Sequence, residues 1–237
     1  MVDPDSWWLD EGRHAGREHF DEQHARRYDA KMDAEAAEEI RLLQTSGVLD
    51  RTSTVVDLGA GSGQFAVAVA PVCRRVVAVD VSPVMLRQLV ENVERSGARN
   101  VEAGNAGFLT YTHAGDRADL VYSRYALHHL PDFWKALALR RIAELLRPGG
   151  VLRLSDVVYS FEPADAERRI DAWITETMST DVERGWTRAE LAEHVRDEHS
   201  TFTWLLEPMI ERAGLEIADA GYSDDGIFAQ YLIRKAP

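Results

Sequence analysis

The 237-residue chain has a single cysteine and no long apolar run. Cys73 cannot form an internal disulfide or a cysteine-rich metal site, and it lies in an apolar stretch where burial is expected. The longest apolar run, residues 65–73, includes a proline and has about half the length that a bilayer span requires. The acidic N-terminus lacks the basic and then apolar pattern of a signal peptide. We therefore expect a cytoplasmic protein without redox chemistry.

The chain also lacks an excess of positive charge, since its formal net charge is −13. Residues 1–50 carry 13 acidic and 6 basic residues, residues 51–159 carry 10 and 13, and residues 160–237 carry 17 and 8. Nucleic-acid binding needs clustered Lys and Arg that displace counterions from phosphate, and an acidic surface repels polyanions. Nucleic acid and membrane are therefore not expected as partners. We expect a small-molecule substrate, and a homodimer is compatible with this composition.

The composition, with 45% hydrophobic and 28% charged residues, is that of an ordinary globular protein, and the length fits a single domain over residues 1–237. Between residues 52 and 158, short β-branched runs alternate with amphipathic helical stretches, which is typical of a parallel sheet with crossover helices. Strands are expected at 54–58, 76–80, 100–103, 119–123 and 151–155, and helices at 64–72, 83–96 and 133–146. The pattern predicts an α/β fold with a Rossmann-like, doubly wound sheet of five parallel strands.

Helical segments are expected on both sides of this core. Residues 18–43 have the pattern of polar helices, which predicts an N-terminal helical cap over residues 1–50. Helices at 164–178, 188–195 and 203–213 follow the fifth strand, where an insertion covers the carboxyl ends of the strands, so residues 159–213 are predicted to form a lid. The runs 215–221 and 228–234 predict an antiparallel hairpin that closes the sheet within residues 214–237. The ligand-binding core is then residues 51–158.

A glycine-rich turn between the first strand and the first helix is the most informative segment. Asp57 ends the strand, and Gly59, Gly61 and Gly63 follow at alternate positions. Glycine lets a ligand approach the backbone, and a helix N-terminus offers unpaired N–H groups. Asp80 ends the second strand, where an acid in such folds accepts hydrogen bonds from ribose hydroxyls. The spacing G-x-G-x-G departs from the NAD fingerprint G-x-G-x-x-G, and the charge of Asp57 suits a cationic cofactor better than a pyrophosphate.

Four segments together resemble the class I S-adenosylmethionine-dependent methyltransferases. They are Asp57-Leu58-Gly59-Ala60-Gly61-Ser62-Gly63 with Asp80, Ser82-Pro83-Val84-Met85-Leu86, Ala126-Leu127-His128-His129-Leu130 and Leu146-Arg147-Pro148-Gly149-Gly150. The resemblance covers residues 50–158. It implies a Rossmann-like sheet with a reversed last strand, S-adenosyl-L-methionine (SAM) as cofactor and S-adenosyl-L-homocysteine (SAH) as product.

The resemblance also implies which residues contact the cofactor. The backbone of Gly59, Ala60, Gly61 and Gly63 would hold the methionine moiety, Asp80 the ribose, and Val81 and Met85 the adenine. Asn105 stands where similar enzymes carry an acid that binds the adenine amino group, and its side-chain carbonyl can still accept from that group. Further cofactor contacts are expected from Tyr28, Asp57, Gly104, Ala106 and Ser123.

Candidates for catalysis are fewer, because methyl transfer from a sulfonium needs positioning and desolvation more than a fixed catalytic group. Tyr125 follows the fourth strand and could hydrogen-bond an acceptor. His128 and His199 are candidate bases because histidine titrates near neutrality, although His128 and His129 can equally orient a loop. Asp197, Glu198 and His199 are consecutive and cannot all face one metal ion from a regular helix, so no metal site is expected.

The sequence thus predicts SAM-dependent methyl transfer to an O, N or C atom of a small-molecule acceptor. One alternative is a protein that keeps the SAM-binding fold without methylating, either as a binding module or as the catalyst of a rearrangement. An NAD-linked oxidoreductase is the remaining alternative, since a strand, a glycine turn, a helix and an acid also describe NAD sites.

Overall fold

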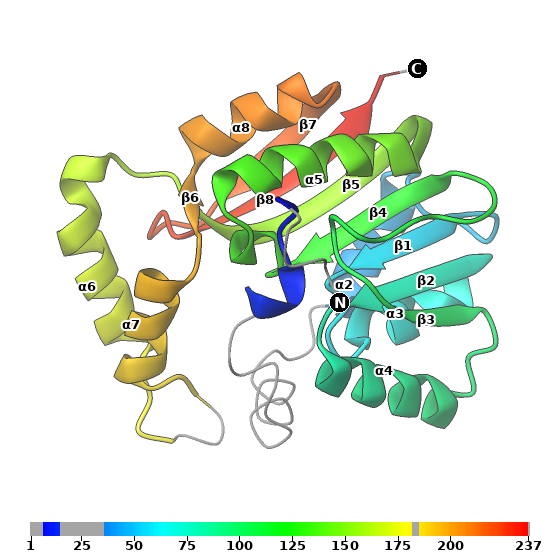
Figure 1. Ribbon diagram of the computed structural model, residues 1–237, viewed down its shortest axis with the longest axis horizontal. Helices are drawn as coiled ribbons and strands as arrows, with labels where there is room; N and C mark the ends of the chain where they lie inside the picture. The colour runs from blue at the N-terminus through cyan, green and yellow to red at the C-terminus, as the bar shows by residue number, and fades with distance from the viewer. Residues whose placement is uncertain (1–6, 15–35, 182–184, 237) are drawn as a thin grey trace.

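The computed structural model describes residues 7–14, 36–181 and 185–236. A mixed sheet forms the centre, with its strands in the order β3-β2-β1-β4-β5-β8-β7 (Figure 1). The parallel strands are β1 (Thr54–Leu58), β2 (Arg75–Asp80), β3 (Val101–Asn105), β4 (Ala118–Arg124) and β5 (Leu146–Tyr159). Strand β8 (Phe228–Lys235) runs antiparallel to both β5 and β7 (Leu215–Tyr222). The Rossmann-like sheet of five parallel strands with a closing hairpin is therefore confirmed.

The helices of the core begin and end close to the positions that the sequence predicts. They are α3 (Gln64–Val69), continued by η3 (Ala70–Val72), α4 (Pro83–Ser96) and α5 (Asp132–Leu145). The bounds of α4 agree because its signals are local: the Ser82 hydroxyl accepts from the Met85 N–H, proline occupies the first turn, and Gly97 ends the helix with φ +71°.

Strand β5 is longer than the predicted segment 151–155. Its extension past Ser155 depends on two partners: β8 pairs with it up to Val157, and the two-residue strand β6 (Thr201–Phe202) pairs with Val158 and Tyr159. A strand of two residues has too little periodicity to be seen in the sequence, so both β6 and the end of β5 were missed.

Helices cover both faces of the sheet. Helices α5 and α8 (Thr203–Arg212) lie on the near face in Figure 1 and bury Leu139, Ile142 and Ile210 against the sheet. On the opposite face, α3 and α4 pack with α2 (Ala36–Thr45), which buries Ile40 and Leu43. Because α8 packs on the sheet beside α5, only the earlier part of the segment 159–213 extends beyond the carboxyl ends of the strands.

That earlier part contains η5 (Pro163–Asp165), α6 (Ala166–Thr177) and α7 (Arg188–Asp197). Trp173 and Leu191 form a separate small core with Val157 and Tyr159 at the end of β5, so the two helices project to one side of the sheet (Figure 1). Residues 15–35, which include most of the predicted N-terminal helices, lie outside the described part of the chain. Within the described ranges, no helix is long and apolar enough to cross a membrane.

Candidate functional site

A pocket lies at the carboxyl ends of β1, β2 and β4, where the strand order reverses and ligands bind in such sheets. The predicted cofactor residues that line it are Asp57, Gly59, Ala60, Gly61, Asp80, Val81 and Ala106. Tyr125, one of the predicted catalytic residues, lines it as well. The structure thus brings the glycine turn and both aspartates to one cavity, as their positions at strand ends predict.

The glycines of the turn have different roles. A Cβ on Gly59, where φ is +72°, would lie 2.3 Å from Ala126 Cβ, and a Cβ on Gly63 would lie 2.9 Å from Leu89 Cγ. These two glycines therefore permit close packing inside the protein. A Cβ on Gly61 would meet nothing within 4 Å, so this residue leaves its space open to the pocket. Gly63, predicted to bind the cofactor, starts α3 and does not line the pocket.

Two carboxylates meet beneath the turn. Asp80 accepts hydrogen bonds from the N–H groups of Gly61 (2.8 Å) and Ser82 (2.7 Å), which fix its orientation. Asp57 is only 2% exposed, and its Oδ2 has no hydrogen-bond partner. Burial, together with the negative charge of Asp80, raises the pKa of Asp57 to about 8. A buried carboxyl with an unpartnered oxygen in the wall of a pocket is suited to a cationic ligand, whose charge would favour the ionised form.

Other residues that were predicted to bind the cofactor lie next to the pocket without lining it. Asn105 donates its side-chain N–H groups to the carbonyls of Asp80 (2.9 Å) and Val81 (3.2 Å), and so fixes the segment that follows β2. Met85 and Ser123 are buried, at 1% and 0% exposed. The residues predicted to bind the cofactor that do not line this pocket are Gly63, Met85, Gly104, Asn105 and Ser123. Tyr28 lies outside the described residues.

The pocket includes an acid that sequence reasoning missed. Glu11 belongs to the short helix η1 (Glu11–Arg13) and is 5% exposed. Its Oε2 accepts hydrogen bonds from the Leu109 N–H (3.0 Å) and from the Thr110 hydroxyl (3.1 Å). Burial raises the pKa of Glu11, although these hydrogen bonds lower it in part. Gly107 leaves room for it, because a Cβ there would lie 2.5 Å from Glu11 Oε1. Nothing local to residue 11 indicates this contact, which joins segments 98 residues apart.

Tyr125 has an unusual backbone. Its φ is +50°, and it is the one non-glycine residue with positive φ among those described. Its N–H donates to the Ser155 carbonyl (2.9 Å), and its ring packs edge-on against Phe228, with 5.8 Å between centroids. Strained backbone of this kind persists where neighbouring contacts hold it, and it gathers at functional sites. These two contacts hold Tyr125 in the wall of the pocket in spite of the strain.

The predicted catalytic histidines lie elsewhere. His128 is 5% exposed and does not line the pocket, whereas its neighbour His129 does. His128 Nδ1 lies 2.5 Å from Asp156 Oδ1; burial alone lowers the pKa of His128, but the charges of Asp156 and Glu198 raise it to about 10. His199 donates its backbone N–H to the His128 carbonyl (3.0 Å) and does not line the pocket either. His128 and His129 are consecutive in η4 (Leu127–His129), so their side chains point in different directions and only that of His129 faces the cavity.

The sequence of residues 55–150 matches the family model described as a methyltransferase domain. This match, together with the methyltransferase relatives, supports a class I SAM-dependent methyltransferase domain over residues 55–150. An uncharacterized methyltransferase, YcgJ, from Bacillus subtilis (strain 168) is 31% identical over 130 residues, which cover 54% of this chain and 49% of that protein. The match thus spans about half the length of this relative.

Other methyltransferase relatives act on different acceptors. The 27-O-demethylrifamycin SV methyltransferase of Amycolatopsis mediterranei is 31% identical over 126 residues, covering 48% of this chain and 43% of that protein. The ribosomal protein L11 methyltransferase of Pelotomaculum thermopropionicum is 39% identical over 107 residues, covering 44% and 32%. The crystal structure of the [4+2]-cyclase SpnF superposes with a TM-score of 0.62 at 18% identity, covering 83% of this chain and 80% of that one. An identity this low shows the fold alone.

Proposed function

We propose that the protein transfers the methyl group of SAM to a small organic acceptor. The observation that supports this proposal most directly is Asp57, a buried carboxyl with an unpartnered oxygen in the wall of the pocket. SAM fits this site because it has a positive charge for Asp57, ribose hydroxyls for Asp80 and polar groups for the backbone at Gly61. When bound, SAM supplies an activated methyl group. The chain's own contribution is then to hold the donor, exclude water and orient the acceptor.

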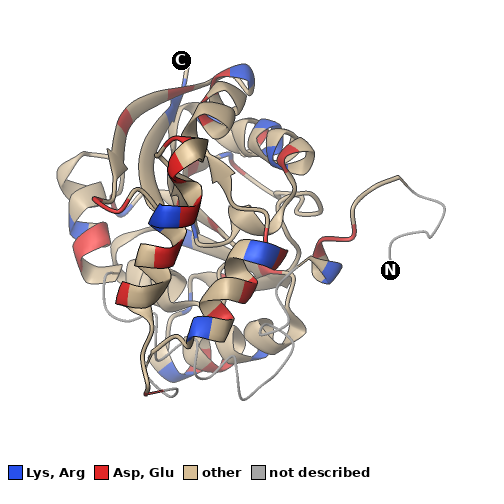
Figure 2. Cartoon of the chain, turned by 90° about the vertical axis from the view of Figure 1, so that its left-hand side faces the viewer, with Lys and Arg blue, Asp and Glu red and all other residues tan. Residues whose placement is uncertain are grey.

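The acceptor is proposed to be a small organic molecule because both polar and apolar side chains line the pocket. Arg124, Tyr125, His129 and Leu130 all line it, so it offers hydrogen-bonding groups as well as apolar ones. Figure 2 shows acidic and basic residues interspersed on the helices that face the viewer, and among the residues drawn in colour no continuous basic face is visible. This distribution, with the net charge of −13, disfavours a nucleic-acid acceptor. The rifamycin-related relative is consistent with a small acceptor.

Binding calorimetry with SAM, SAH and NAD tests the cofactor. We expect SAM and SAH to bind the full chain and NAD not to bind. Binding of NAD in the absence of SAM binding would overturn the proposal in favour of an oxidoreductase. The same titrations on Asp80→Asn serve as the control for location, because a ligand held at this pocket must lose affinity when that carboxylate is neutralised.

Incubation with SAM and a panel of small hydroxylated, amine and carbon-acid metabolites tests methyl transfer. The expected result is SAH release that depends on one class of acceptor, with a product heavier by one methyl group in mass spectrometry. SAM binding without SAH release on any acceptor class, including ribosomal protein, would instead favour a fold that binds SAM without methylating. Conversion of a metabolite to an isomer without SAH release would favour a rearrangement, the class of reaction for which the SpnF likeness is of interest.

A further inference from the structure

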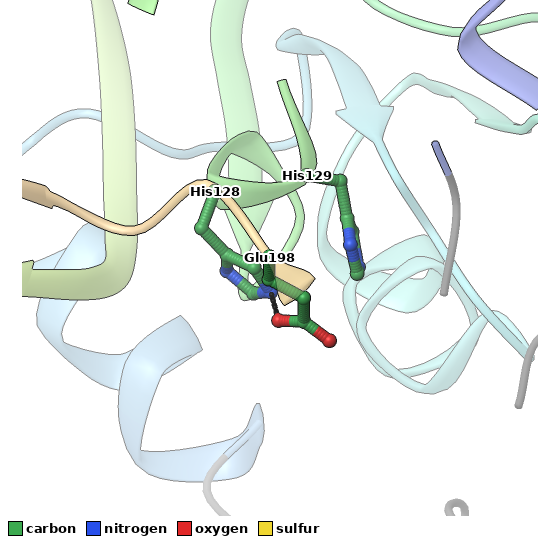
Figure 3. Close-up of side chains that lie close together, drawn as sticks. All are labelled: His128, His129 and Glu198. Atoms are coloured by element: carbon green, nitrogen blue, oxygen red, sulfur yellow. Dashed lines mark ion pairs between the residues drawn. The ribbon is translucent and has the colours of Figure 1, made fainter. Parts of the chain in front are cut away.

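A cluster of imidazole and carboxylate groups lies between η4 and the end of α7. His128, His129 and Glu198 each place one ligand atom within 4.8 Å of the others (Figure 3). Helix α7 adds His194, one turn before Glu198 on the same face, and its Nδ1 forms an ion-pair contact with Glu198 Oε2. The His128 ring lies 4.4 Å from that of His129 and 5.1 Å from that of His194, between centroids. Three histidines therefore surround one carboxylate.

Glu198 forms ion-pair contacts with two of these histidines. Glu198 Oε2 lies 3.0 Å from His128 Nε2 and also contacts His194 Nδ1, yet this buried oxygen accepts no hydrogen bond. A proton on either nitrogen would need to point along the line to the oxygen to stabilise such a contact. Ligand atoms that share one tetrahedral ion at about 2.0–2.1 Å are roughly 3.3 Å apart, and His128 Nε2 and Glu198 Oε2 are 3.0 Å apart.

A buried carboxylate orients His128 from the other side of its ring. Asp156 Oδ1 lies 2.5 Å from His128 Nδ1, and Asp156 is itself fixed by the N–H groups of Val157 (2.8 Å) and His128 (3.0 Å). Histidines that bind metals usually donate their second ring N–H to a carboxylate in this way, which sets the tautomer and directs the other lone pair at the ion. Here Nε2 of His128 is directed at Glu198 Oε2, and a bound metal ion would take the place of a proton between these two atoms.

We propose that His128, His129 and Glu198, together with His194, bind a divalent transition-metal ion of the zinc class. Imidazole nitrogen and carboxylate oxygen are the donor types that Zn²⁺ and Co²⁺ accept, whereas Mg²⁺ and Ca²⁺ prefer oxygen alone. A rotation of the half-buried His129 or Glu198 side chain closes the remaining distance. Because His129 also lines the pocket, the ion lies in its wall, joining η4 to α7. The site does not depend on the identity of the acceptor.

Zinc content and zinc affinity of the full chain, prepared without a polyhistidine tag, test the site. We expect one ion per chain after dialysis against zinc, and Co²⁺ in its place should give the strong visible absorption of tetrahedral coordination. Glu198→Gln keeps the shape of the side chain and should weaken zinc binding by about 10–100-fold. Glu193→Gln is the matched control, since Glu193 is an exposed acid on the same helix, and it should leave binding unchanged.

His129→Asn provides a second variant if Glu198→Gln fails to fold, because His129 is half-buried and can be replaced with little loss of packing. It should also weaken zinc binding by at least about 10-fold. The proposal is overturned if the wild-type chain binds no zinc, or if Glu198→Gln and His129→Asn bind it as tightly as Glu193→Gln. Loss of binding in both cluster variants with retention in the control supports it.

Discussion

Replacing Asp57 with asparagine tests the electrostatic basis of the site. The pKa of this carboxyl is 3.8 in an unperturbed chain and about 8 in the folded protein, so between these values the folded state holds one proton more than the unfolded state. By linkage, the stability that this proton contributes is fully present below about pH 4 and is lost as the pH rises through 8. The slope approaches about 1.4 kcal/mol per pH unit within that window.

Asparagine is neutral at every pH, so the variant lacks this slope. Chemical denaturation of ligand-free protein between pH 5 and 9 should show that the free energy of unfolding of Asp57→Asn rises relative to that of the wild type until about pH 8. This rise should be several times the error of the measurement, since even two pH units correspond to about 2–3 kcal/mol. The comparison uses the difference in slope and is therefore insensitive to a constant cost of burying the amide.

The same variant tests what Asp57 faces. Two unit charges roughly 5 Å apart in an effective dielectric of about 20 attract by about 3 kcal/mol, which is roughly 100-fold in affinity. Wild-type protein should therefore bind SAM more tightly as the pH rises from 6 to 9, and Asp57→Asn should not. If the sulfonium is the cation, SAH should show little of this dependence; if it is the ammonium, both ligands should show it.

Parallel pH profiles of stability for wild type and Asp57→Asn would refute the reasoning about burial. Equal affinities of the two proteins for SAM and for SAH across this pH range would refute the reasoning about the ligand.

Three further substitutions have definite expected outcomes. Asp80→Asn should weaken SAM by about 1–3 kcal/mol in calorimetry, as the loss of a charge-assisted hydrogen bond, and unchanged affinity would place the ribose elsewhere. Glu11→Ala leaves the buried Leu109 N–H without its partner and should lower the free energy of unfolding by about 1–3 kcal/mol, whereas an equal effect of the exposed Glu38→Ala would contradict this. Gly59→Ala forces a contact of 2.3 Å and should lower the melting temperature far more than Gly61→Ala, which shares the positive φ but meets no neighbour; equal losses would show that strain rather than packing dominates.

The sequence by itself determined the parts of the fold whose causes are local. The bounds of β1 and α4 agree with the structure because a β-branched run, a serine cap with proline and a terminal glycine act within a few residues. Asp57 and Asp80 could be placed at one pocket for a similar reason, since both end parallel strands that topology brings side by side.

The tertiary structure decided what depends on partners distant in the chain. The end of β5 extends only because β6 and β8 pair with it. Glu11 lies in the pocket next to Leu109, which is 98 residues later in the chain. Glu198 contacts His128 only because α7 packs beyond the end of β5. Such contacts arise from chain closure and packing, whose outcome is set by many weak interactions together and leaves no periodic or capping signal in the residues themselves.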